Sequence, residues 1–348
     1  MRYLLLALAP FLLLFCKNEV PPHRLVVSVA QAALRAAPGE RSVPLQSLKA
    51  GETVTDLGET SRFESVIRFQ GEARQAPWLR VRTTSRQEGW LFAGAIEPLG
   101  HQTDWLLQKR LACYFGPALT ARRNTLVNRP GQAADEATLA LLYRSSVSLR
   151  DTFTQLLARR AETGAADVQI DFAWLSNALP GFIYQQVAEG TQVWLFAQYR
   201  FWADAAKETA GQQDDLFFTA GLTAFPIDSI ESFFPDWKFQ ISDTEAASRL
   251  GDGVHWKMLL AVEQAWAAGP LFHPELAALK NQVLEDILGK NTVFWQPKEK
   301  IVRELGQIVE RRFTSLSQQE RAELQLRLRM FDDPKANGIR VNARAGTE

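Results

Sequence analysis

The spacing of apolar and polar residues divides this chain into four stretches. A continuous apolar run occupies residues 4–15, and residues 26–99 then alternate apolar and polar positions in short runs separated by Gly, Pro and charged residues. Such alternation is typical of strands in a small β barrel. From 102 to 331 the apolar positions recur with the period of amphipathic helices, and 332–348 form a polar tail that is expected to be flexible. The pattern predicts a small β barrel followed by a larger all-α domain.

The helical period is clearest at 139–157 and 301–313. Ser and Glu three residues apart at 242–245 and 317–320 have the form of capping boxes that begin helices. The aromatic residues within 191–202 lie on more than one helical face, so they predict a single central helix surrounded by protein. We expect about eight to ten helices and no strand before the tail.

The apolar run near the N-terminus ends abruptly at Cys16. The run is shorter than the about 20 residues that a helix needs to cross a membrane, so the first 16 residues are typical of an export signal. Residues 13–16 resemble a bacterial lipobox, although Phe15 stands where the motif prefers a small residue. The resemblance implies a lipid anchor on Cys16, a tether at 17–25 and, because Lys17 follows, the outer membrane. An uncleaved short anchor and a chance apolar N-terminus are the alternatives.

Four short motifs follow one another within the predicted β domain. They are Leu-Arg-Ala-Ala-Pro-Gly at 34–39, Leu-Lys-Ala-Gly-Glu-Thr-Val at 48–54, Trp-Leu-Arg-Val-Arg at 78–82 and Gly-Trp-Leu-Phe at 89–92. Their order and spacing resemble bacterial SH3 domains, so an SH3-like barrel is expected over 26–99. The resemblance implies binding of cell-wall peptide or of an envelope protein. Two departures are a longer stretch between residues 58 and 77 and Ala33 in place of the usual Asn.

Aromatic residues of this domain are the candidate ligand contacts. Alternation within one strand places Leu79 and Val81 inside and leaves the intervening arginines in solvent. Trp78 and Trp90 then belong either to the core or to an aromatic groove. Phe63, in the longer stretch, is the third candidate. The glycine before Trp90 is expected to permit a close backbone approach, because it has no Cβ.

Charge and cysteine content exclude two classes of protein, nucleic-acid-binding proteins and disulfide-stabilised scaffolds. The 39 Lys+Arg balance the 39 Asp+Glu, and no long basic run is present. Because nucleic-acid binding depends on several neutralised phosphates, no nucleic-acid partner is expected. Two cysteines cannot make a disulfide scaffold. With Cys16 lipidated, Cys113 lies in an apolar helical pattern and is expected to be a small buried hydrophobe.

Common catalytic and metal-binding motifs are missing from the sequence. There is no Gly-rich phosphate loop, no H-E-x-x-H and no G-x-S-x-G, and Asp252, His255 and His273 do not have zinc-ligand spacing. Glu231 and Ser232 resemble the Glu-Ser pair of lytic transglycosylases, but the remainder of that motif is absent. We therefore expect no catalytic residue, no metal and no cofactor.

These expectations lead to a non-catalytic, lipid-anchored binding or scaffold protein of the cell envelope, on the periplasmic or surface face. Its expected partners are the membrane, through the lipid anchor, and either peptidoglycan or an envelope protein. The alternative is an envelope enzyme of the cell-wall hydrolase type, with an unrecognised active site in the aromatic-rich region 217–256.

Overall fold

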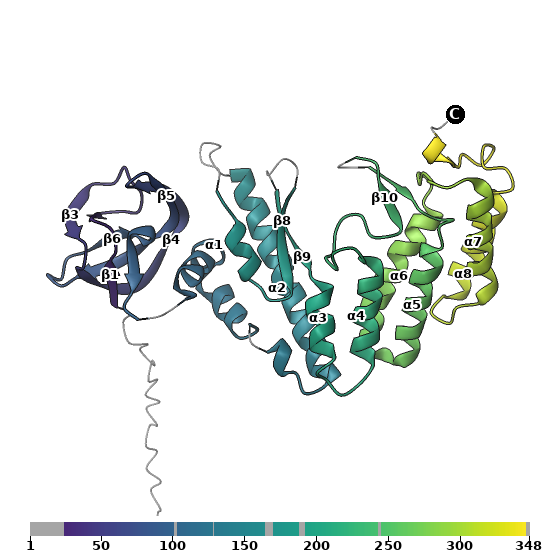
Figure 1. Cartoon of the computed structure of the whole chain (residues 1–348), viewed down its shortest axis with the longest axis horizontal. Helices are drawn as coiled ribbons and strands as arrows, with labels where there is room; N and C mark the ends of the chain where they lie inside the picture. The colour runs from purple at the N-terminus through teal and green to yellow at the C-terminus, as the bar shows by residue number, and fades with distance from the viewer. Residues whose placement is uncertain are drawn as a thin grey trace, which may run out of the picture. The chain divides into compact units, whose positions relative to one another are not determined.

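The computed structural model (Figure 1) describes residues 24–100, 103–127, 129–163, 170–187, 192–242 and 245–345. The chain divides into two compact units, Met1–Cys113 and Tyr114–Glu348. Cys16 and the predicted signal and tether lie outside the described residues. In the part of the chain that is described, no helix combines the length and the apolar character needed to span a membrane.

The first unit contains one antiparallel sheet of seven strands, drawn in purple and blue in Figure 1. The strands are β1 (Arg24–Val27), β2 (Gln31–Arg35), β3 (Pro44–Lys49), β4 (Thr53–Phe69), β5 (Glu72–Thr83), β6 (Glu88–Phe92) and β7 (Ile96–Pro98). Their order in the sheet is β3-β2-β6-β5-β4-β1-β7. The sheet does not close, so β3 and β7 are its edges, and what the structure shows is an antiparallel sheet followed by a helical region.

A long hairpin accounts for the stretch between residues 58 and 77. β4 and β5 pair from Val54↔Thr83 out to Phe69↔Glu72, with register shifts on either side of Thr60. The hairpin turns at Gln70 and Gly71, which both have positive φ, as a two-residue turn between twisted strands requires. The longer stretch is therefore the outer part of one hairpin.

Burial in the sheet follows the predicted alternation. Leu79 and Val81 are fully buried, whereas the side chains of Arg80 and Arg82 remain partly exposed and pair with Glu88. The close approach at Gly89 is also confirmed, because a Cβ at this position would lie 2.7 Å from the carbonyl oxygen of Arg35. Packing of β2 against β6 therefore requires a glycine here.

The first turns of α1 (Trp105–Asn124) belong to the first unit, beyond the predicted boundary at residue 99. Trp105 joins the core of the sheet. Lys109 pairs with the buried Asp56, and Nε of Arg110 lies 2.9 Å from Oε1 of Glu64. The helix is kinked at Gly116, where the backbone angles are non-helical with φ at 81°, and a proline follows.

The second unit is mainly helical. After α1 its helices are α2 (Glu136–Thr163), α3 (Tyr199–Ala206), α4 (Gln213–Ala224), α5 (Val254–Ala268), α6 (His273–Leu288), α7 (Lys298–Arg311) and α8 (Gln318–Met330). In Figure 1, α3 packs against α4, α4 against α5, and α5 against both α6 and α7. The predicted period at 139–157 lies in α2, and that at 301–313 lies in α7 except for Phe313, which follows the end of the helix at Arg311. The predicted capping box of Ser317 begins α8.

Two hairpins contradict the expectation of an all-α domain. They are β8 (Phe182–Val187) with β9 (Gln192–Ala197), and β10 (Lys238–Gln240) with β11 (Ala246–Ser248). The single helix predicted at 191–202 is wrong: β9 ends at Ala197 and α3 begins at Tyr199. Aromatic residues occupy several faces of this segment because they belong to two elements of different period.

The second predicted capping box is also wrong. Nitrogen of Glu245 donates to Oγ of Ser242 at 3.2 Å, which is the predicted bond, but it forms between β10 and β11 instead of at a helix start. Serine can make the same local bond in a turn as at an N-cap, so the motif alone does not separate the two.

Candidate functional site

The three aromatic residues predicted to bind a ligand occupy different environments. Trp78 is only 1% exposed, and its Nε1 donates to Oγ of Ser65 at 2.8 Å. Trp90 is half-buried, and Phe63 is 44% exposed. Trp78 lines a hollow on the first unit, and neither of the other two is among its lining residues. The structure therefore does not bring the predicted trio together.

That hollow, which we call the sheet groove, has a volume of about 450 Å³ and an aromatic base. The ring of Trp78 meets Phe92 edge-on at 5.6 Å, and Phe92 stacks with Phe69 at 6.1 Å. The hollow is lined by Gln31, Ala32, Ala33, Arg35, Glu40, Ile67, Arg68, Phe69, Trp78, Leu91, Phe92 and Ala95. The outer part of the β4–β5 hairpin supplies one of its sides.

Charged side chains of both signs border the sheet groove. Nη1 of Arg35 donates to the carbonyl oxygen of Ser42 at 2.6 Å, and its guanidinium lies 6.0 Å from the Trp78 ring. Arg68 and Glu40 are exposed, and among the described residues neither has an ion-pair partner. The sequence reasoning missed Arg68 and Glu40. The alternation of apolar and polar residues on both sides of Gln70-Gly71 is the signal that could have located the hairpin, and with it Arg68.

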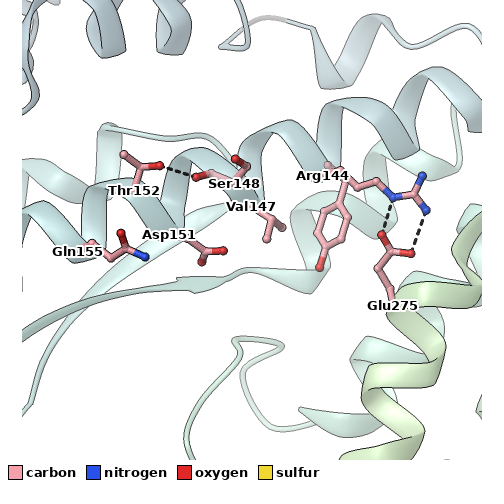
Figure 2. A pocket seen from close by; sticks show the side chains of 8 residues that line it. Arg144, Val147, Ser148, Asp151, Thr152, Gln155 and Glu275 are labelled. Atoms are coloured by element: carbon pink, nitrogen blue, oxygen red, sulfur yellow. Dashed lines mark hydrogen bonds and ion pairs between the residues drawn. The ribbon is translucent and has the colours of Figure 1, made fainter.

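The second unit carries a hollow of about 440 Å³ along one face of α2, which we call the α2 hollow. Figure 2 shows Arg144, Val147, Ser148, Asp151, Thr152 and Gln155 on successive turns of this helix, with Glu275 of α6 opposite Arg144. The Arg144 guanidinium donates to both carboxylate oxygens of Glu275, at 2.5 and 2.9 Å. These hydrogen bonds raise the pKa of Arg144. The pair joins α2 to α6.

A larger hollow of about 860 Å³, the central hollow, carries two exposed aromatic rings. Trp194 of β9 is 37% exposed and Phe233 is 48% exposed, and their rings meet edge-on at 5.1 Å. Phe196 contacts both rings: it stacks with Trp194 at 6.5 Å and meets Phe233 edge-on at 5.1 Å. Neutral polar side chains surround these rings: Thr154, Gln155, Gln192, Ser232 and Gln282.

An ion pair lies in the same central hollow. Nη1 of Arg150 is 2.8 Å from Oε2 of Glu231, and that oxygen also accepts from the backbone nitrogen of Ala197 at 3.1 Å. Nε of Arg150 donates to Asp151 at 2.8 Å. Burial lowers the pKa of Arg150, but the charges of Glu231 and Asp151 raise this pKa by more than burial lowers it, so the net shift is upward. Arg150 and its two carboxylate neighbours together carry one net negative charge.

The α2 hollow, the central hollow and a third one adjoin each other. The first two share Asp151 and Gln155. The third, of about 530 Å³, shares Phe233 and Gln282 with the central hollow and extends along α6 to Lys290. We call the three together the helical-unit groove. Its residues come from distant parts of the chain, so no local spacing could have indicated it.

The residues considered for catalysis are buried or engaged in structural contacts. Cys113 is 2% exposed, and His255 is fully buried with Nε2 2.8 Å from Oδ2 of Asp286. In the region 217–256 the rings of Phe217 and Trp237 belong to the core. Across the described residues, no three His, Cys, Asp or Glu side chains are grouped as a metal site would require.

Comparisons with protein family models, with curated proteins and with solved structures found no match. Function must therefore be inferred from the geometry of this chain.

Proposed function

We propose that this protein is a non-catalytic, lipid-anchored binding protein of the cell envelope. In this proposal Cys16 carries the lipid that holds the chain at the outer membrane. The N-terminal sheet acts as an SH3-like module whose barrel is extended by the β4–β5 hairpin. The four SH3-like motifs support this assignment, since the residues at 78–82 lie on β5 and those at 89–92 on β6, which are neighbours in the sheet.

The observation that carries the proposal is an aromatic base bordered by the opposite charges of Arg68 and Glu40, for which the described part of the chain provides no ion-pair partner. Arg68 offers a guanidinium that can bind a carboxylate with two hydrogen bonds, and Glu40 can bind an ammonium group. A cell-wall stem peptide carries free carboxylates together with an amine. Its short aliphatic side chains match the surface formed by Phe69 and Phe92. We therefore assign cell-wall peptide, in preference to an envelope protein, as the ligand of this groove.

Binding of a soluble stem tetrapeptide to the purified full-length chain tests the proposal. Arg68→Ala and Glu40→Ala should each weaken the affinity about tenfold, because each removes a charge-assisted contact. Arg62→Ala is the matched control, since Arg62 is also an exposed arginine of β4 but does not line the groove. Equal affinity of the wild type and Arg68→Ala, or no binding at all, would contradict peptide recognition by this groove.

A further inference from the structure

The central hollow of the helical-unit groove combines aromatic rings with neutral polar side chains and with one arginine that pairs with two carboxylates. Arg150 lies 2.8 Å from both Glu231 and Asp151, so the three groups together carry one net negative charge. This charge repels an anionic ligand, and a cationic ligand would have to compete with Arg150 for the carboxylates. The central hollow therefore favours an uncharged ligand.

The two exposed rings define what kind of uncharged ligand fits. The rings of Trp194 and Phe233 meet edge-on and so offer two apolar surfaces at nearly a right angle. Gln192 and Gln282 place side-chain amides beside them, and the amide oxygen of Gln192 accepts from Nε1 of Trp194 at 3.4 Å. An amide both donates and accepts hydrogen bonds, so it suits a ligand with many hydroxyl groups. A sugar ring has this composition: one face of C–H groups and a periphery of hydroxyls. A purely apolar ligand would cover these amides without offering them a hydrogen bond.

The extent of the groove indicates more than one sugar unit. Hollows lie on both sides of the central one and are joined to it by shared residues, Asp151 and Gln155 on one side and Phe233 and Gln282 on the other. The central hollow alone lies within the about 300 to 1,000 Å³ that a small-molecule site usually offers. A chain of sugars could continue from it in either direction.

From these observations we propose that the helical unit binds a neutral oligosaccharide, with Trp194 and Phe233 stacking on sugar rings and Gln192 and Gln282 hydrogen-bonding to hydroxyls. This inference does not rest on the proposed peptide binding, because it concerns other residues in the other unit. The two sites together would let one chain hold the peptide and the glycan parts of the same cell-wall polymer.

The test measures binding of three neutral tetrasaccharides to the purified full-length chain by calorimetry and saturation-transfer NMR. The probes are tetra-N-acetylchitotetraose, cellotetraose and maltotetraose, with an oligogalacturonate as the anionic comparison. We expect at least one neutral probe to bind and the anionic one to bind more weakly. Trp194→Ala and Phe233→Ala should each weaken binding about tenfold or more, as aromatic contacts at the centre of a site do.

Three control variants separate a loss of contact from a loss of fold. Trp194→Phe keeps an aromatic face and should retain most of the affinity. Phe239→Ala removes another exposed aromatic ring, 40% exposed and outside the groove, and should leave the affinity unchanged. Gln282→Ala, on the exposed face of α6, should weaken binding and leave the melting temperature unchanged. Gln264→Ala, at an exposed position of α5, should change neither the affinity nor the melting temperature.

Specific outcomes would overturn the inference. One is that no neutral probe binds at about 10 mM, a concentration above the Kd of a weak site. The others are equal binding by the wild type and Trp194→Ala, and tighter binding of the anionic probe than of the neutral ones. A chain that binds a tetrasaccharide but no stem peptide supports this inference and contradicts the proposed function. The converse result contradicts the inference alone.

Discussion

Nη1 of Arg150 lies 2.8 Å from Oε2 of Glu231 and thereby joins α2 to the segment that follows α4. Both side chains are more than two-thirds buried. The pair borders the exposed ring of Phe233, so it stabilises the fold and also shapes the surface of the central hollow. Because a backbone nitrogen of β9 donates to the same oxygen, three segments meet at one carboxylate.

Breaking this ion pair should destabilise the second unit. Glu231→Ala leaves Arg150 with Asp151 alone and should lower the free energy of unfolding by about 1 to 3 kcal/mol. In a double-mutant cycle, Glu231→Ala combined with Arg150→Ala should cost less than the sum of the two. Urea denaturation measures both. Asp204→Ala, which breaks an exposed pair with Lys207, is the control and should have little effect. Additive costs in the cycle would show that the pair is not coupled.

Trp78 and Trp90 of the N-terminal sheet should differ in their contribution to stability. Trp78→Ala removes a fully buried ring and should cost about 3 to 5 kcal/mol. Trp90 is half-buried, so Trp90→Ala should cost about 1 to 2.5 kcal/mol, in proportion to the smaller buried area. Thermal melts of both variants, followed by near-ultraviolet circular dichroism, give the comparison. A larger cost at Trp90 than at Trp78 would mean that the assigned burial is wrong.

Substituting Gly89 should reveal how closely β2 approaches β6. A methyl group there would overlap the Arg35 carbonyl, so Gly89→Ala should cost about 1 to 3 kcal/mol through displaced backbone. Gly306 of α7 has open space around it, and Gly306→Ala should instead stabilise the chain by about 0.5 to 1 kcal/mol. Chemical denaturation should thus give opposite signs for the same substitution, and equal signs would contradict the assigned geometry.

Glu263 should make stability depend on pH. Its carboxylate accepts from the backbone nitrogens of Thr314 and Ser315 at 2.8 and 2.9 Å. Oγ1 of Thr314 also donates to Oε1 of Glu263 at 2.7 Å. Burial raises the pKa of Glu263, but the hydrogen bonds from the side chains and backbone nitrogens of Thr314 and Ser315 outweigh burial, so the net pKa is lowered. The folded pKa then lies below the unfolded value of about 4.3, so the stabilisation is complete above that pH and is lost as pH falls through the folded pKa.

Glu263→Gln should therefore lower the free energy of unfolding at pH 7 by about 1 to 3 kcal/mol, and the difference from wild type should shrink below about pH 4. Urea titrations at several pH values test this. Glu310→Gln, at an exposed position of α7, serves as the control. A difference that stays constant with pH would assign the loss to packing instead of to the charge.

Replacing Cys16 with Ser should abolish labelling by a palmitate analogue and release the protein from the membrane fraction. The reason is that the apolar run before Cys16 is too short to hold the chain by itself. Membrane fractionation at high salt, with Cys113→Ser as the matched control, measures it. If Cys16→Ser stays bound and the wild type takes up no lipid, a signal anchor replaces the lipoprotein assignment.

Sequence patterns correctly predicted those structural elements that depend on contacts between residues close together in the chain. The capping box at Ser317 and the alternation of Leu79 and Val81 depend on neighbours within a few residues, and both were correct. The segment around Trp194 was misassigned because a short apolar and aromatic run suits either a strand or a helix. Pairing of β9 with β8 and packing against α2 decide its structure, and neither is visible in the local sequence.

The candidate sites could be predicted only in part, for the same reason. Trp78 could be proposed as a groove residue because it lies in a recognisable motif. Arg68 could not, because it borders the groove only once the β4–β5 hairpin has folded beside the aromatic base. In the helical-unit groove, Arg150, Trp194 and Gln282 come from three separate elements. Their proximity results from tertiary packing, so sequence spacing carried no signal for it.

The open edge at β3 affects how the protein behaves when many copies are crowded together. An edge strand offers unpaired backbone groups to any neighbour, and here Val43 and Leu45 add exposed apolar surface beside them. Pro44, which has no backbone N–H, and Lys49, which is charged, stand at the two ends of the strand. The proposed lipid anchor would confine molecules to two dimensions and raise their collision frequency. In such a layer the proline and the lysine would oppose edge-to-edge pairing of β3.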